Sequence, residues 1–264
     1  MRKYLEVMKI TFKNELAFRF DVIFNMLFTV IKILFAYILW GAIFGSNKLV
    51  AGFTYDTMLS YYIISSFLSQ IELSDGVSGE ISARIRNGTF SKYMVLPAHV
   101  EAYFLVQTLG ATAFYLSFDF IAALIWIFIF HIEFAFTGSL FLIVIAFVLI
   151  LQGLVFMVQL NYLLGILTFK FQDIQLFLMI KNNLVAFITG ALIPLALLPE
   201  VITAFMRFFP FYYVTYLPSM LLIGRNGEEA ITGVLVLGGW MVVLFFLNRF
   251  LYNRLRRKYD GVGI

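Results

Sequence analysis

Long apolar segments alternate with short polar segments along the whole chain. A helix needs about 20 mostly apolar residues to span the hydrocarbon core of a membrane. Six segments reach or approach that length, at residues 22–44, 58–74, 102–130, 139–169, 176–198 and 231–252. The third and fourth are long enough to tilt or to extend beyond the bilayer. The pattern predicts an all-α polytopic membrane protein with six transmembrane helices in a single domain, residues 1–264.

The composition favours lipid as the solvent of this chain. Hydrophobic residues make up 62% of the 264 residues and charged residues only 13%, whereas soluble domains carry about 25% charged residues. The 32 Phe and 14 Tyr residues are typical of lipid-facing surface and of anchoring at the membrane interface. Cys is absent, which excludes disulfides and thiolate metal sites.

The basic residues predict how the spans are oriented. With the N-terminus inside, the inner segments carry 15 of the 19 Lys and Arg residues, and Lys32 lies within the first span. The outer segments carry three, which are Lys48, Arg207 and Arg225. Because cytoplasmic loops are enriched in Lys and Arg, we expect both termini in the cytoplasm and an even number of crossings.

The N-terminal segment, residues 1–21, has an amphipathic pattern. Leu5, Met8, Phe12 and Leu16 recur at steps of three or four residues, and polar side chains occupy the other faces. This spacing predicts a helix that lies on the inner leaflet. A solvated helix that merely precedes the first span is the alternative.

Two further segments outside the spans have helical signals. Residues 79–90 form a short polar stretch bounded by Gly79 and Gly88, which predicts a short cytoplasmic helix. Residues 199–218 contain three prolines, and an apolar face between them predicts an outer re-entrant or interfacial segment with a short helix over 200–209. Pro194 is expected to bend or break the fifth span.

A few polar residues fall inside the predicted spans. Lys32 and Asp119 lie in the middle of the first and third spans, where ionisable groups are costly. They either neutralise each other as structural contacts or take part in charge transfer. Gln152, Gln159 and Asn161 lie in the fourth span, with Gln152 and Gln159 seven residues apart on one face. They either line a substrate pathway or hydrogen-bond between helices.

The chemistry of an enzyme is missing from the sequence. No phosphate-binding loop of the form G-x-x-x-x-G-K-[ST] and no H-E-x-x-H motif occurs. The predicted topology places His99 and His131 on opposite sides of the membrane, so they cannot share a metal. We therefore expect no catalytic residue, no metal and no cofactor bound by this chain.

Two stretches resemble the permease subunits of ABC-2 type transporters. Residues 80–90, continuing to Leu96-Pro97, are similar to that family's coupling segment, although Leu96-Pro97 stands where an Arg-Pro ending is common. The second stretch is a series of glycines and prolines made of Gly190, Pro194, Pro199, Pro210, Pro218 and Gly224. In layout the resemblance covers nearly the whole chain.

The resemblance implies a half-transporter of the bacterial plasma membrane. Two permeases, identical or different, would bind two separate ABC ATPase subunits that hold ATP and Mg. The substrate would be a lipid, glycan, peptide or drug-like molecule, and nucleic acid is not an expected partner. The ATPase-coupling residues would be Glu80, Ile81, Arg84, Ile85 and Arg86.

We expect a specific contact for each side of this coupling helix. Ile81 and Ile85 would enter a groove of the ATPase, and Arg84 or Arg86 would meet acidic groups at its rim. Asp at position 81 or 85 would then detach the ATPase from a folded permease. Glu80 and Arg84 are four residues apart and can pair. An ion-coupled secondary transporter and a membrane scaffold without transport are the alternative functions.

Overall fold

The computed structural model describes residues 2–15, 17, 19–45, 49–69, 74–95, 99–130, 133–190 and 195–259. Over these ranges the chain is built of helices and contains no β-strand, with one isolated bridge between Val50 and Phe53. The predicted all-α class is confirmed.

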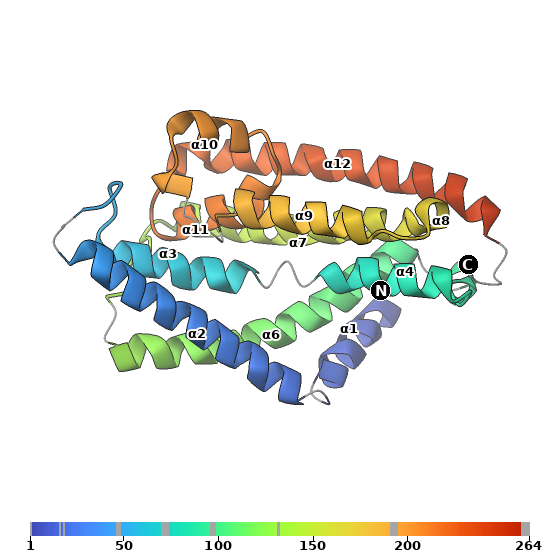
Figure 1. The fold of residues 1–264 in the computed structure, drawn as a ribbon, viewed down its shortest axis with the longest axis horizontal. Helices are drawn as coiled ribbons and strands as arrows, with labels where there is room; N and C mark the ends of the chain where they lie inside the picture. The colour runs from blue at the N-terminus through green and yellow to red at the C-terminus, as the bar shows by residue number, and fades with distance from the viewer. Residues whose placement is uncertain are drawn as a thin grey trace.

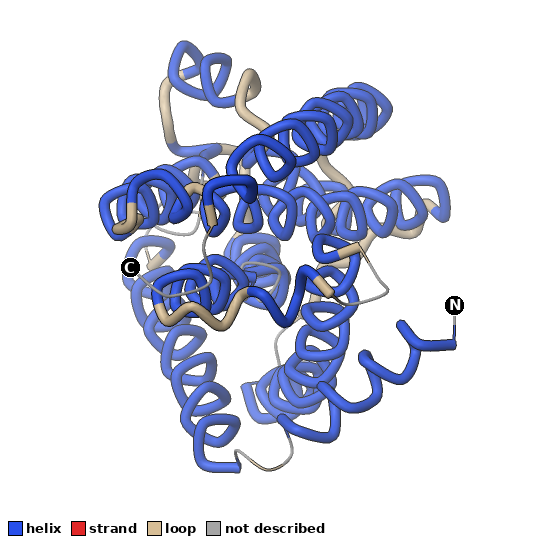
Figure 2. Tube along the Cα trace, turned by 90° about the vertical axis from the view of Figure 1, so that its right-hand side faces the viewer, coloured by secondary structure: helices blue, strands red, loops and turns tan. Residues whose placement is uncertain are grey.

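Most of the longer helices run along the long axis of the molecule, whereas α2 (Arg19–Phe44) and α6 (Val100–Phe130) slant across it in opposite senses (Figure 1). In Figure 2, which looks toward one end, several of them are seen nearly end-on. The longer helices are α2 (Arg19–Phe44), α3 (Tyr55–Leu68), α6 (Val100–Phe130), α7 (Leu140–Ile166), α9 (Gln175–Ile188) and α12 (Ala230–Leu255).

Shorter helices connect the long ones or cap their ends. The α-helical ones are α1 (Arg2–Glu15), α4 (Asp75–Arg86), α5 (Ser91–Met94), α8 (Thr168–Phe171), α10 (Glu200–Met206) and α11 (Leu217–Leu222). A π-helix covers Tyr212–Tyr216, and 3-10 turns cover Leu195–Leu197, Gly227–Glu229 and Arg256–Lys258. Helix α4 lies at the same end of the molecule as the last turns of α12 (Figure 1).

The main core forms where α7 packs against α12 and α11. Two glycines allow close contacts between helices in this core. A Cβ added to Gly233 of α12 would lie 2.5 Å from Cδ2 of Leu217, and one added to Gly153 of α7 would lie 3.2 Å from Cγ1 of Val214. Small residues of this kind let helix backbones approach in membrane proteins, where apolar burial alone does not drive association.

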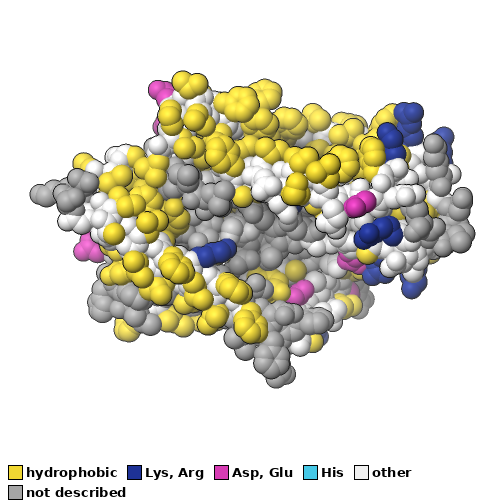
Figure 3. All heavy atoms as spheres, viewed as in Figure 1, with side chains coloured by type: hydrophobic (Ala, Val, Ile, Leu, Met, Phe, Trp, Pro, Cys, Tyr) yellow, Lys and Arg dark blue, Asp and Glu magenta, His cyan; other side chains and the backbone are white. Residues whose placement is uncertain are grey.

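Much of the apolar surface remains exposed outside this core. Large hydrophobic side chains are exposed along α2, α7, α9 and α12, and hydrophobic atoms cover much of the face seen in Figure 3. Soluble monomers rarely expose contiguous apolar patches of such extent. The exposed side chains therefore fit a lipid-facing surface.

Two helical stretches in the described residues are long and apolar enough to cross a membrane, Leu140–Phe171 and Gly227–Leu255. Two shorter apolar stretches are Val30–Phe44 and Gln175–Ile188. They match the predicted fourth, sixth, first and fifth spans in position. The count of six spans stays a prediction.

Several helix ends differ from the sequence-based bounds. Helix α3 ends at Leu68, short of the predicted 74, and α7 ends at Ile166 before the separate turn of α8. Helix α9 ends at Ile188 instead of 198, and Gly190 follows with a positive φ of 76°. A glycine in this conformation commonly ends a helix. Lys48, Leu96, Pro97, His131 and Pro194 lie outside the described residues.

Helix α1 packs against α6. The rings of Phe12 and Phe114 meet edge to face with centroids 5.2 Å apart, and Tyr115 donates a hydrogen bond to Glu15 at 3.1 Å. Leu5 and Ile10 of α1 are exposed. The placement of α1 on the inner leaflet stays a prediction, and Leu16 lies outside the described residues.

The predicted orientation can be tested with single cysteines, because the chain has none of its own. Gly138 and Asn87 are both exposed, and the predicted topology places them on opposite sides. In intact cells an impermeant thiol reagent should label Gly138→Cys and spare Asn87→Cys, which should react only after permeabilisation. Labelling of position 87 in intact cells would contradict the orientation.

Candidate functional site

Helix α4 is longer than its sequence signals suggest. It begins at Asp75, so Gly79 lies inside the helix instead of before it. At the other end, the carbonyl oxygen of Arg84 accepts hydrogen bonds from the backbone N–H groups of Thr89 and Phe90. Gly88 has a φ of 71° in this turn, which agrees with its predicted place just after the helix.

The inner face of α4 is apolar and fully buried. Ile81 and Ile85 are 0% exposed and belong to a cluster with Phe90, Phe104 and Ile166. A Cβ added to Gly165 of α7 would lie 2.8 Å from Cβ of Ile81. The two helices therefore approach closely at this glycine, and Ile81 fills the space that a side chain at position 165 would occupy.

This burial corrects the expectation that Ile81 and Ile85 enter a groove of the ATPase. Both side chains already pack against this chain's own helices, so neither is available to a partner in this structure. An apolar pair on a polar helix buries itself against the nearest apolar surface, and α7 provides that surface. The pair fastens α4 to α7.

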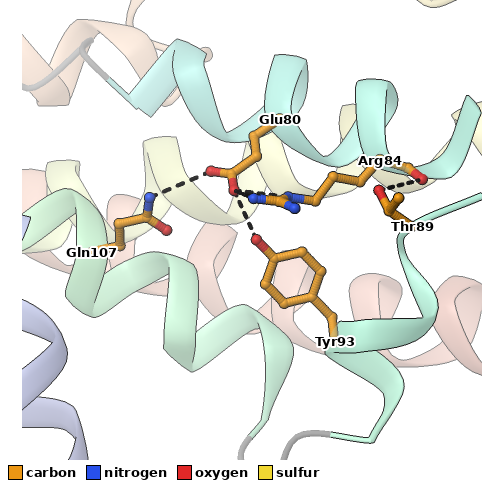
Figure 4. Close-up of polar contacts among 5 residues, drawn as sticks. All are labelled: Glu80, Arg84, Thr89, Tyr93 and Gln107. Carbon is orange, nitrogen blue, oxygen red and sulfur yellow. Dashed lines mark hydrogen bonds and ion pairs between the residues drawn. The ribbon is translucent and has the colours of Figure 1, made fainter. Parts of the chain in front are cut away.

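A hydrogen-bond network around Glu80 ties α4 to α5 and α6 (Figure 4). Oε1 of Glu80 accepts hydrogen bonds from Nη2 of Arg84 at 2.8 Å and from the hydroxyl of Tyr93 at 2.7 Å. Oε2 accepts from Nε2 of Gln107 on α6 at 3.3 Å. The pairing of Glu80 with Arg84 that the sequence predicted is confirmed.

The electrostatics of this network keep Tyr93 and Arg84 each in one protonation state. Burial raises the pKa of the Tyr93 hydroxyl, and its hydrogen bond to Glu80 raises it further. Burial lowers the pKa of the Arg84 guanidinium, but its interactions with Glu80 and Tyr93 together hold it above its ordinary value. Tyr93 therefore stays a neutral donor and Arg84 stays charged near neutral pH.

The opposite side of the same segment is open. Its exposed residues, which we call the α4–α5 surface, are Arg86, Asn87, Ser91, Lys92 and Val95. Val95 is 81% exposed although it is apolar. The exposed aliphatic side chain and the two exposed basic groups of this segment are available for contact with another protein.

The polar residues of α7 separate into two places. Gln152 lies near α12, since a Cβ added to Gly238 would be 3.4 Å from Nε2 of Gln152. The backbone oxygen of Gln159 also meets α12, because it accepts a hydrogen bond from Asn248 at 3.0 Å. Asn161 is fully buried on another side of α7. These three residues therefore do not form one continuous polar stripe.

Asn161 is part of a buried network that the sequence did not reveal. Its Nδ2 donates to Oγ of Ser74 at 2.8 Å, and its Oδ1 accepts from Nζ of Lys181 at 3.3 Å. Lys181, one of the 15 basic residues counted as inner, is buried within α9. Its position inside the predicted fifth span is the signal that points to such burial.

Lys32 is exposed on α2, next to the buried Ile33. The side chain of Asp119 lies outside the described residues. Neutralisation of one by the other stays a prediction.

The close contact between α4 and α7 gives a prediction with a matched control. Gly165→Ala should lower the free energy of unfolding by about 1–3 kcal/mol, the usual cost of overpacking, because the Cβ of the new alanine would collide with Ile81. Gly239→Ala, on the exposed side of α12, has no atom within 4 Å of the new Cβ and should be neutral or slightly stabilising. Thermal unfolding in detergent would measure the stability of both variants, and equal effects would contradict the packing of α4 against α7.

One of two sequence comparisons finds a match for this chain. No curated protein matches the chain. Residues 30–263 match the family described as "ABC-2 family transporter protein". The match runs from within α2 past the end of α12 and includes α4, α5 and the α4–α5 surface. Because it covers well over half of the sequence, the chain belongs to the ABC-2 family of transporter membrane proteins.

Proposed function

We propose that this chain is the permease subunit of an ATP-driven ABC-2 type exporter, and that a separate subunit supplies the ATPase. The observation that carries this proposal is the two-sided construction of the α4–α5 segment. One side is buried against α7 and hydrogen-bonded to α6, and the other is basic and exposed. The chain itself has no phosphate-binding loop.

The buried side would transmit motion into the membrane helices. Ile81 and Ile85 pack on α7, and Glu80 bonds to Gln107 on α6. Because packed interiors transmit displacement with little compression, a push on α4 would move these two helices as a rigid unit. The coupling residues thus keep their proposed role, with Glu80, Ile81, Arg84 and Ile85 acting inside the permease.

The exposed side would form the contact with the ATPase. Arg86 and Lys92 favour an acidic surface on the partner, and Val95 favours an apolar recess within it. Complementary charges of this kind govern association rate and specificity. Of the residues that the sequence suggested, only Arg86 belongs to this contact.

The complete exporter would contain two permeases and two ATPases. ATP and Mg would bind only to the ATPases, and the permeases would be two copies of this chain or this chain with a related one. The substrate would be a lipid, glycan, peptide or drug-like molecule. The complex would lie in a bacterial plasma membrane with the permease termini in the cytoplasm.

Purification of the tagged full-length chain from its native membranes tests this proposal. An ATP-hydrolysing subunit with a phosphate-binding loop should co-purify at a constant ratio, and its activity should depend on the permease. A chain that purifies alone and moves its substrate on an ion gradient would instead be a secondary transporter. A chain that purifies alone and transports nothing would be a scaffold.

A further inference from the structure

A cavity of about 530 Å³ lies between the start of α6, the second half of α7 and the last third of α12. The start of α6 and the end of α12, which line it, lie at the end of the molecule that carries α4 (Figure 1). Most of its wall is apolar, formed by residues such as Leu105, Val155, Val158 and Phe245. The α4–α5 surface does not take part in it.

The mouth of the cavity borders the apolar surface of α12. Phe245 lines the cavity and is itself 44% exposed. Phe246 and Phe250, which project from other sides of the same helix, are 64% and 60% exposed. A ligand that enters here passes an apolar surface of the kind that faces lipid, which favours a lipid over a water-soluble ligand.

One end of the cavity is rich in hydrogen-bond acceptors. Glu101, Gln159 and Asn248 meet there, and Nδ2 of Asn248 donates to Oε1 of Glu101 at 3.1 Å. The side-chain oxygens Oε1 of Gln159 and Oδ1 of Asn248 are buried and have no donor among the described residues. Because buried acceptors without a donor are costly, this end is complementary to a group with several N–H donors.

The charge of Glu101 agrees with this complementarity. Glu101 precedes the predicted third span, and burial raises the pKa of its carboxyl, although hydrogen bonds from Asn248 and Gln159 oppose the shift. A cation in contact with this carboxylate would offset the cost of burying its charge.

The wall formed by α12 adds positive charge. Arg249 lies on α12 and Arg256 in the 3-10 turn that follows it, and both line the cavity. No ion pair joins either one to an acidic group in the described part of the chain. Arginine is well suited to phosphate, which it binds through a planar pair of donors.

We propose that this cavity binds a membrane phospholipid whose headgroup carries a primary ammonium. The phosphate would lie against Arg249 and Arg256, and the ammonium would donate to Glu101, Gln159 and Asn248. The apolar wall would hold the start of an acyl chain. This lipid site is separate from the α4–α5 surface and does not depend on the identity of the ATPase.

Native mass spectrometry of the purified full-length chain in detergent tests the site. The probes are the dihexanoyl forms of phosphatidylethanolamine, phosphatidylcholine and phosphatidic acid, with free phosphoethanolamine as the soluble source of the same headgroup. Phosphatidylethanolamine should bind about ten-fold more tightly than phosphatidylcholine, because the choline nitrogen has no N–H to donate. A ten-fold difference in affinity corresponds to roughly 1.4 kcal/mol. Phosphatidic acid, which lacks the amine, should also be weaker.

Substitutions in two parts of the cavity test binding of the phosphate and binding of the ammonium separately. Arg249→Gln with Arg256→Gln should weaken phosphatidylethanolamine binding by at least about ten-fold. The matched pair Arg254→Gln with Arg257→Gln, on the same helix end but outside the cavity, should bind as the unaltered chain does. Glu101→Gln retains an oxygen for Asn248 and should remove the preference for ethanolamine over choline.

Three results would overturn the proposal. The first is equal binding of the three lipids, and the second is equal loss from both arginine pairs. The third is saturation by free phosphoethanolamine at the same concentration as by the lipid, which would indicate a soluble ligand. Each can be obtained on folded protein, because the four arginines are exposed in the structure.

Discussion

Ile81→Asp should remove most of the folded protein from the membrane, and Val95→Asp should leave its amount unchanged. Ile81 is fully buried against Gly165 in a cluster of apolar side chains, where a carboxylate would be removed from water. An unpaired buried charge costs several kcal/mol, out of a total stability of about 5–15 kcal/mol. Size-exclusion chromatography of the detergent-extracted protein and its unfolding temperature would measure the loss.

The conservative variant Ile81→Val provides the control for this experiment. It removes one methyl group and should cost only about 0.5–1.5 kcal/mol. This prediction reverses the expectation from the sequence, which was that Asp at position 81 detaches the ATPase from a folded permease. A normal amount of Ile81→Asp protein with a normal unfolding temperature would restore that expectation and refute the burial.

Reversing two charges on the α4–α5 surface should abolish binding of the ATPase without unfolding the permease. Arg86 and Lys92 are exposed, and exposed substitutions usually change stability by no more than about 0.5 kcal/mol. Arg86→Glu with Lys92→Glu would place like charges against the acidic partner that we propose. Since such contacts cost several kcal/mol, co-purification should fall by at least about 100-fold.

Conservative exchanges at the same positions test whether ATPase binding depends on the positive charges or on the shape of the side chains. Arg86→Lys with Lys92→Arg keeps both charges and should retain the ATPase. Binding of the single reversal, Lys92→Glu, should gain less from low salt than binding of the unaltered chain, because the repulsion of the new carboxylate then offsets the attraction of Arg86. Full retention of the ATPase by the doubly reversed permease would show that the contact lies elsewhere.

The sequence predicted the local features of the site well. The four-residue spacing of Glu80 and Arg84 is sufficient for an ion pair within one helix, and Gly88 marks the end of α4 through its own backbone preference. Each of these features depends on residues close together in the chain. The all-α class follows similarly from the length of the apolar segments.

The surroundings of the same helix could not be predicted. The spacing of Ile81 and Ile85 defines an apolar face, but the same spacing fits packing on this chain or on a partner. The contact of Ile81 with Gly165 shows that this face packs on the chain itself, and Gly165 lies far along the chain on α7. Helix periodicity contains no information about which surface an apolar face will meet.

Long-range polar contacts were missed for a related reason. Glu101, Gln159 and Asn248 come from three different helices, and the hydrogen bond from Asn248 to Glu101 joins residues 147 positions apart. The early end of α9 was hidden as well, because the apolar character of the chain continues beyond Gly190. Hydropathy records the apolar segment but not the positive φ that interrupts it.

Site-specific photo-crosslinking from Val95 tests the central claim most directly. A photoreactive amino acid would replace Val95 or, as a control, Val201 of α10, which is 82% exposed compared with 81% for Val95. The predicted topology places the two positions on opposite sides of the membrane. In native membranes the ATPase should crosslink to position 95 and not to position 201, whereas no crosslink at 95, or equal crosslinks at both positions, would contradict the account.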